Sequence, residues 1–347
     1  MKLIITQLLL ILILLVGCKK DNPPVQPIET PPITTATTHY VLVCNEGQFN
    51  TGNASVSRIE TNGTSTVDIY KAANNKPLGD IAQSITAINN KYYIAVNNSG
   101  KIEVVNTSDF KNIATIQGLI SPRYILRVGN NRAYVSNFKL TNTLNYIQVI
   151  NTQTNVIIDS IALDGWAEKM VLIGTKAYVT NGSNKYLYVI NTSTNTIDTT
   201  IELTNAVTDI VKDNSNNVWV LCGDYNSHPN YIAYINTTTN VVEQTINFVN
   251  TSDFLHIAYN ATSNTLFLLD KNIYALNKTS SLLELVVNKG VHNFYNFGID
   301  VTNQHLIVSD AKDFQQQGYV YRYSLNNYVL LDSSKVGIGP SEIFVKE

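Results

Sequence analysis

This sequence is poor in charge, in cysteine and in histidine clusters. Charged residues make up 14% of its 347 residues and the net charge is −2, so it lacks the basic surface that nucleic-acid binding requires. Its three cysteines are too few for a disulfide framework, and its five histidines stand singly, without zinc-ligand spacing. No serine elbow, HExxH motif or pair of catalytic carboxylates can be identified. We therefore expect no nucleic-acid partner, no metal site and no enzymatic activity.

The one long apolar run lies at the N-terminus. Leu3–Val16 spans about fourteen residues after Lys2, which is short of the ~20 needed to cross a membrane as a helix. It ends in Leu-Val-Gly-Cys at Cys18, which resembles a bacterial lipobox. We predict a signal peptide over residues 1–17 and a lipid on Cys18. Because Lys19 and not Asp follows, we expect an outer-membrane, lipid-anchored protein that is exposed at the cell surface.

Residues 18–38 read as a tether. The segment is rich in threonine, has no apolar periodicity and contains five prolines: Pro23, Pro24, Pro27, Pro31 and Pro32. Proline-rich linkers are extended and semi-rigid, at ~3.1 Å per residue. The predicted tether would therefore hold the folded part, residues 39–347, away from the membrane, with the lipid as its only membrane contact.

What the folded part has in abundance is a repeated Asn/Thr turn between two apolar strands. Marker asparagines 106, 151, 191, 236, 277 and 326 are 45, 40, 45, 41 and 49 residues apart. Asn and Thr suit such turns because their side chains bond their own nearby backbone. Repeats of this length that hold only strands are typical of a β-propeller. We predict an all-β, seven-bladed β-propeller with four-stranded blades.

The first repeat is incomplete. It offers strands at Tyr40–Glu46, Ala54–Glu60 and Thr66–Tyr70, whereas a fourth, innermost strand is missing. A suitable strand, Pro340–Val345, follows the last full repeat. We therefore predict that the C-terminal strand closes blade one, since an open ring would leave long unpaired strand edges.

Function is expected in the loops of one face, because rigid scaffolds present binding residues on loops. There Arg123 could instead pair with an acidic neighbour, Trp166 could pack between blades, and the recurring asparagines suit turns. The candidate ligand-binding residues are Asn45, Phe49, Gln83, Asn97, Arg123, Asn137, Trp166, Glu168, Asp224, Tyr225 and Asp310.

The same loops carry a family resemblance. The motifs are Asn45-Glu46-Gly47-Gln48-Phe49, Gly79-Asp80 with Gln83-Ser84, Asn97-Asn98-Ser99-Gly100 and Pro122-Arg123-Tyr124. With them the chain resembles the YncE-like propeller lipoproteins of Bacteroidetes, and is similar to those that capture cobalamin above a TonB-dependent outer-membrane transporter. The resemblance implies a corrinoid ligand and a transporter partner, with no cofactor required. A protein–protein scaffold and a lactonase-like propeller enzyme stay open as alternatives.

Overall fold

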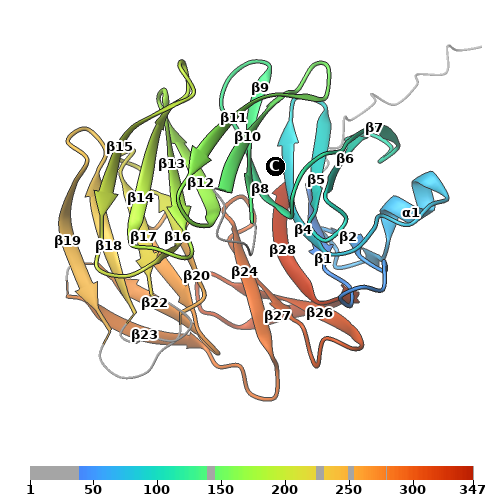
Figure 1. Ribbon diagram of the computed structural model, residues 1–347. Helices are drawn as coiled ribbons and strands as arrows, with labels where there is room; N and C mark the ends of the chain where they lie inside the picture. Colours follow the sequence, from blue (N-terminus) through green and yellow to red (C-terminus); the bar gives the residue numbers. More distant parts are fainter. Residues whose placement is uncertain (1–38, 139–144, 224–229, 249–253, 279, 347) are drawn as a thin grey trace, which may run out of the picture. The chain divides into compact units, whose positions relative to one another are not determined.

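Seven four-stranded antiparallel sheets follow one another around a ring (Figure 1). The computed structural model describes residues 39–138, 145–223, 230–248, 254–278 and 280–346, which belong to one compact unit. The predicted seven-bladed β-propeller with four-stranded blades is confirmed. Cys18 and the predicted signal peptide and tether lie outside the described residues.

Each blade runs from an innermost strand at the ring centre to an outer strand at the rim. The innermost strands of blades one to seven are β28 (Pro340–Lys346), β4 (Ala82–Ile88), β8 (Pro122–Arg127), β12 (Ala167–Ile173), β16 (Val207–Lys212), β20 (His256–Asn260) and β24 (Phe294–Asp300). The second strands are β1 (Tyr40–Asn45), β5 (Lys91–Val96), β9 (Arg132–Asn137), β13 (Lys176–Asn181), β17 (Val218–Cys222), β21 (Thr265–Leu269) and β25 (His305–Asp310). The third strands are β2 (Ser55–Glu60), β6 (Lys101–Asn106), β10 (Asn145–Asn151), β14 (Tyr186–Asn191), β18 (Tyr231–Asn236), β22 (Ile273–Asn277) and β26 (Gln317–Ser324). The outer strands are β3 (Ser65–Thr66), β7 (Asn112–Ile116), β11 (Val156–Leu163), β15 (Thr196–Glu202), β19 (Val241–Asn247), β23 (Leu282–Val287) and β27 (Leu330–Ile338).

The repeated Asn/Thr turn joins the third and outer strands, as predicted. In blade four, Asn191 pairs with Thr196, and the Asn191 Oδ1 accepts a hydrogen bond from the Ser193 N–H at 2.9 Å. The turn ends at Asn195 with φ 58°, a left-handed conformation that asparagine tolerates. The same left-handed asparagine ends the turns of blades three and five, at Asn155 and Asn240.

Burial decreases from the second strand outward. In blade four, β13 is buried from Ala177 to Asn181, whereas β15 is mostly exposed. The cores lie between neighbouring sheets, where apolar side chains of adjacent blades pack together. This packing holds each innermost strand at the wall of a central channel.

The C-terminal strand closes the ring. β28 pairs antiparallel with β1, with Val41 opposite Val345 and Val43 opposite Ile343. Figure 1 shows the red end of the chain against the blue start. The prediction that the last strand supplies the innermost strand of blade one is confirmed.

The predicted third strand of the first repeat is wrong for most of its length. Of Thr66–Tyr70, only Thr66 belongs to a strand, the two-residue β3, and a short helix, α1 (Ile69–Asn74), follows. The Asp68 carboxylate caps this helix by accepting a hydrogen bond from the Lys71 N–H at 3.1 Å. Side-chain capping and burial of Tyr70 therefore outweigh the strand-like pattern. None of the described helices is long and apolar enough to span a membrane.

The two cysteines of the propeller lie in different blades. Cys44, in blade one, and Cys222, in blade five, are both buried and free. Burial raises the pKa of the Cys222 thiol to about 12, so this thiol stays protonated at neutral pH.

Candidate functional site

The loops expected to carry function share one face of the ring, because the end of every second strand lies against the start of its innermost strand. The paired residues are Asn45–Pro340, Val96–Ala82, Asn137–Pro122, Asn181–Ala167, Cys222–Val207, Leu269–His256 and Asp310–Phe294. We call this side of the propeller the loop face.

At the loop face, six of the seven blades have a register shift where the innermost strand begins. A β-bulge of this kind re-aims side chains and is common beside functional sites. The residues at these irregular starts include Gln83, Arg123, Glu168, Asp209 and Glu342. They meet across the central channel, one from each of five blades.

The first group in the channel centres on Arg123. Its Nε donates to Oε2 of Glu168 at 3.0 Å, and its Nη1 donates to Oε1 of Gln83 at 2.5 Å. Burial raises the pKa of Glu168 above its usual value, although Arg123 opposes that rise. The guanidinium is thus held by one carboxylate and one amide from the two blades on either side of it.

The second group centres on Asp209. The Lys169 Nζ donates to its Oδ2 at 2.8 Å, and His256 Nδ1 lies 3.2 Å from the same oxygen. Burial works to raise the pKa of Asp209, but Lys169 and His256 together hold it below its usual value. Burial and Lys169 lower the pKa of His256, which favours the neutral imidazole. Lys169 and His256 remain 22% and 21% exposed, so water reaches them inside the ring.

Two further carboxyl groups make no ion pair among the described residues. The Glu46 Oε1 accepts a hydrogen bond from the Tyr295 hydroxyl at 3.2 Å. The Glu342 Oε2 lies 3.5 Å from the Asn296 Nδ2, which donates to it. Burial raises the pKa of Glu46, and it raises the pKa of Glu342 to about 7. The carboxyl groups of Glu46, Glu168, Asp209 and Glu342 therefore outnumber the two permanent cations, which are Arg123 and Lys169. Clusters of groups with shifted pKa values are common at functional sites.

A depression lies on the loop face, at the loops of blades one and seven. The depression has a volume of about 520 Å³, and Glu46 is part of both its wall and the channel. Phe49, which is 68% exposed, and Phe314 supply aromatic surface. The Gln48 Nε2 donates to the Gln315 Oε1 at 2.6 Å, which links the loops of blades one and seven. We call this hollow the mouth depression.

Backbone strain is concentrated beside the mouth depression. Ile81 and Phe314, which both line it, have φ values of 61° and 60°. A β-branched or bulky residue in the left-handed region is costly and is often found where a site needs a fixed shape.

The structure brings together only part of the predicted ligand site. Gln83, Arg123 and Glu168 meet in the channel, where Arg123 does pair with an acidic neighbour, and Phe49 lies at the mouth depression. Trp166 packs edge-on against Phe138, with ring centroids 4.6 Å apart. Asp224 and Tyr225 lie outside the described residues.

The remaining predicted residues stand at or just after the ends of second strands and bond to the backbone. Asn45 and Asn137 are buried, and their side-chain amides donate to backbone carbonyls, at 3.4 Å to Val43 and 3.0 Å to Val135. Asn97 donates to the Pro122 carbonyl at 3.2 Å. Asp310 is buried and accepts from the Asn293 and Lys312 N–H groups. These contacts reach neighbouring strands and blades as well: Asn45 also donates to the Ser57 hydroxyl at 2.9 Å and accepts from the Gly337 N–H at 3.1 Å.

Sequence reasoning missed most of the channel. The missed residues are Glu46, Tyr124, Lys169, Asp209, His256, Tyr295, Asn296 and Glu342. A signal for them does exist, because the bonded pairs Arg123–Glu168, Lys169–Asp209 and Asp209–His256 are 45, 40 and 47 residues apart, which is one repeat. Aligning the starts of the innermost strands would have found them.

No group of three or more His, Cys, Asp or Glu side chains that could hold a metal ion occurs in the described part of the chain. The channel groups instead form a hydrogen-bonded, water-accessible lining. Such an arrangement can orient a polar ligand through carboxylates, an amide and two cations. Phe49 and Phe314 at the mouth depression can contact its apolar parts.

Together the fold and channel define a seven-bladed propeller with a polar central site. Residues 40–338 match the model of a domain of unknown function (DUF5074), and the chain belongs to this family. No curated protein matches the chain.

Similar solved structures come from several bacteria. A quinoprotein alcohol dehydrogenase-like protein of Bacteroides thetaiotaomicron has a TM-score of 0.69 at 14% identity, covering 90% of this chain and 79% of that one. A functionally unknown protein of Desulfotomaculum acetoxidans has a TM-score of 0.67 at 12% identity, covering 89% and 99%. Hydrazine synthase of Kuenenia stuttgartiensis has a TM-score of 0.62 at 12% identity, covering 75% and 88%. At these identities the likeness shows the fold alone.

Proposed function

We propose that this protein is a surface lipoprotein that binds a small ligand at the mouth depression and delivers it to an outer-membrane transporter. The observation that carries the proposal is that Glu46 lines the mouth depression and also accepts a hydrogen bond from Tyr295, beside the start of an innermost strand. Binding rather than catalysis is favoured, because the channel cations Arg123 and Lys169 are already held by carboxylates.

The ligand class we propose is the corrinoids, and the walls of the mouth depression support this choice. Amide side chains such as Gln48 and Gln315 both donate and accept, so they can answer carboxamide groups in either sense. Phe49 and Phe314 offer apolar surface to a macrocycle. The ligand would spread over the rim, with polar groups directed toward Glu46 and the channel.

Delivery rests on the expected lipid at Cys18 and tether at 18–38, with a TonB-dependent transporter as the partner. The tether would keep the propeller within reach of that transporter while leaving the loop face free to turn toward it. Co-purification of the transporter with the wild-type chain, and its loss for Cys18→Ser, would support this part. Unchanged membrane fractionation of Cys18→Ser would contradict the lipid anchor.

Calorimetry with cyanocobalamin tests the ligand. We expect saturable heat with the intact chain and at least a tenfold weaker affinity for Phe49→Ala, because exposed aromatic anchors carry much of the energy of such contacts. Leu282→Ala is the matched control, since Leu282 is also 68% exposed but lies on the outer strand β23. Arg123→Ala and Trp166→Ala then separate the channel from the rim of blades three and four. No heat at about 50 µM ligand, a concentration well above useful affinities for capture, would reject the corrinoid.

A further inference from the structure

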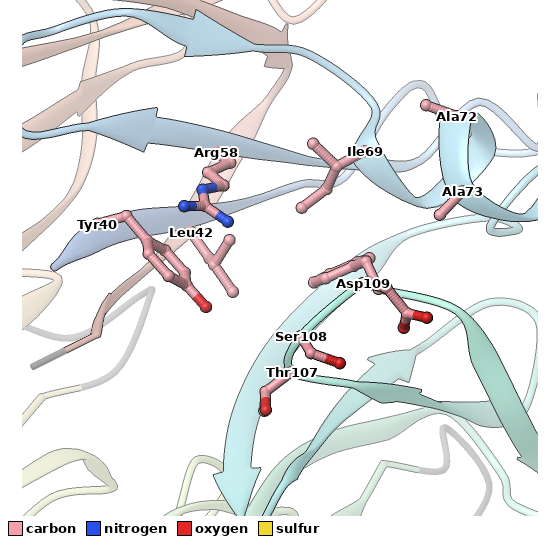
Figure 2. A pocket seen from close by; sticks show the side chains of 10 residues that line it. Tyr40, Leu42, Arg58, Ile69, Ala72, Ala73, Thr107, Ser108 and Asp109 are labelled. Atoms are coloured by element: carbon pink, nitrogen blue, oxygen red, sulfur yellow. The ribbon is translucent and has the colours of Figure 1, made fainter. Parts of the chain in front are cut away.

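A second pocket lies away from the loop face, at the junction of blades one and two (Figure 2). It has a volume of about 250 Å³. Leu42, Ile69 and Phe110 give it an apolar floor, Ala73 of α1 forms one side, and Arg58 stands at the wall. We call it the junction pocket.

Comparison with the next three junctions along the chain shows what differs here. In blades two, three and four, the second strand carries Tyr93, Tyr134 or Tyr178 three residues before its last paired position. The hydroxyl of each tyrosine bonds the side chain of the turn asparagine of the next blade, in the pairs Tyr93–Asn155 at 2.9 Å, Tyr134–Asn195 at 2.8 Å and Tyr178–Asn240 at 2.7 Å. We call this contact the tyrosine latch.

At the junction of blades one and two the latch is replaced by apolar residues. Leu42 holds the tyrosine position in β1, and Phe110 holds the asparagine position with φ 58°. Both line the junction pocket. Blade one also has only a two-residue outer strand, so α1 covers this end of the blade in its place. The missing latch and the short helix together leave the pocket.

The wall of the junction pocket carries a guanidinium with unused donors. Arg58 lies over the Tyr40 ring, with its Cζ 3.8 Å from the centroid. Among the described residues, its guanidinium makes one hydrogen bond, from Nη2 to Oε2 of Glu60 at 3.3 Å. Its Nε also forms an ion pair with Oε1 of Glu60 at 2.7 Å, although that N–H is not aligned to donate a hydrogen bond. A guanidinium has five N–H donors in a fixed fork, so most of these remain available.

The geometry points to a compact apolar monocarboxylate as the ligand of the junction pocket: we propose that Arg58 binds its carboxylate and the floor binds its apolar body. A cavity of about 150 Å³ holds benzene, so the larger junction pocket has room for a ring with a short chain. Asp109 lines the pocket as well and disfavours a second negative charge on the ligand. Such a site is separate from the mouth depression and does not depend on the function proposed for it.

Calorimetry of the purified full-length chain with hydrocinnamate tests the proposal. For a ligand of about eleven non-hydrogen atoms we expect a dissociation constant on the order of 0.1–1 mM. The neutral hydrocinnamamide should bind at least about tenfold more weakly, because it cannot form the charge-assisted pair with the guanidinium. Phenylpropylamine, with the opposite charge, should not bind.

Two variants locate the binding. Arg58→Met keeps an unbranched side chain over Tyr40 and should reduce the difference between the acid and the amide to less than about twofold. Ala73→Phe fills the pocket without touching the charge and should abolish binding of both ligands. Arg127→Met, an exposed arginine on β8, is the matched control and should bind as wild type does.

Several results would overturn the proposal. These are the absence of saturable heat with hydrocinnamate, equal affinities for the acid and the amide, or preference for the amine. Full binding by Ala73→Phe would also overturn it. If Arg58→Met melts early and cannot be titrated, the Ala73→Phe result decides.

Discussion

Blades three, four and five each receive a tyrosine hydroxyl at their turn asparagine from the preceding blade, whereas the corresponding position of blade one is Leu42. The tyrosine hydroxyl bond between blades one and two, Tyr40–Tyr92 at 2.7 Å, instead joins their second strands. The latched blades are built from consecutive strands, while blade one is assembled from both ends of the chain. The latch is thus kept at three consecutive junctions within the continuous part of the chain, and Trp219 takes the tyrosine position at the next one. Where the ends meet, β28 pairing takes over the stabilising role and the junction is free to form a pocket.

Removing the closing strand β28 should lower the stability of the propeller more than any other change considered. Deleting Ser341–Glu347 takes the innermost strand from blade one and exposes the β1 edge. We expect a loss of stability well beyond the ~0.5–3 kcal/mol of an ordinary substitution, measured by thermal or urea unfolding. Deleting only Glu347 is the control and should leave the transition unchanged. Cooperative melting of the longer deletion within a few degrees of the intact chain would contradict the role given to β28.

The next largest effect is expected at Glu342 of blade one, and Glu168 of blade four is its contrast. The pKa of Glu342 is raised to about 7 by burial, so the folded state binds a proton that the unfolded state releases near pH 4.5. Its contribution to stability is therefore present below the unfolded pKa and is lost as pH rises toward 7. The free energy of unfolding of the wild type should therefore fall by up to about 3 kcal/mol between pH 5 and 8 because of Glu342, and Glu342→Gln should not show this fall. Urea unfolding at several pH values measures it.

Glu168→Gln provides the contrast, because Glu168 is paired with Arg123. Removing one partner of such a pair leaves a partly buried guanidinium without its carboxylate, so we expect destabilisation of about 2 kcal/mol at neutral pH. At pH 8, Glu342→Gln should raise the free energy of unfolding and Glu168→Gln should lower it. Such opposite changes would support the assignment of Glu342 as the carboxyl group without an ion-pair partner. Equal signs would contradict it.

The tyrosine latch should give the smallest effect. Tyr134→Phe removes the hydroxyl that bonds Asn195 and leaves the ring in place, so we expect about 1 kcal/mol of destabilisation. Tyr146→Phe, at an exposed tyrosine of β10, is the control. A loss for Tyr146→Phe as large as that for Tyr134→Phe would mean that the latch contributes nothing specific.

The regular part of the fold could be predicted because each local choice agrees with the repeat. The Asn/Thr turns and the C-terminal strand each mark an element, and both predictions are confirmed. The segment at residues 66–70 could not be read this way. There a single capping residue, Asp68, decides between strand and helix, and apolar alternation carries no information about it.

The channel was harder to predict for a different physical reason. Gln83, Arg123 and Glu168 were found because they stand in polar loop motifs. Lys169 and Asp209 lie in apolar-looking strands, and a register shift at the strand start decides which side chain faces the channel. His256 begins β20, which has no such shift and whose short sequence shows no polar motif. Strand alternation alone cannot locate a bulge of one residue, since the shift moves every later side chain to the other face.

Ring closure by β28 also has a consequence for how the protein is made. Strand β1 begins at Tyr40 and its partner ends at Lys346, so this β1 edge stays unpaired until almost the whole chain has been synthesised. The equilibrium cost of so long a loop is small, about 2 kcal/mol more than closing a single repeat, because loop entropy grows only with the logarithm of length. The kinetic cost is larger, since long-range strand pairing is slow and an open apolar edge invites aggregation. During that interval the nascent propeller is an open arc with the β1 edge exposed, and a chaperone that covers strand edges would act on this state rather than on the finished ring.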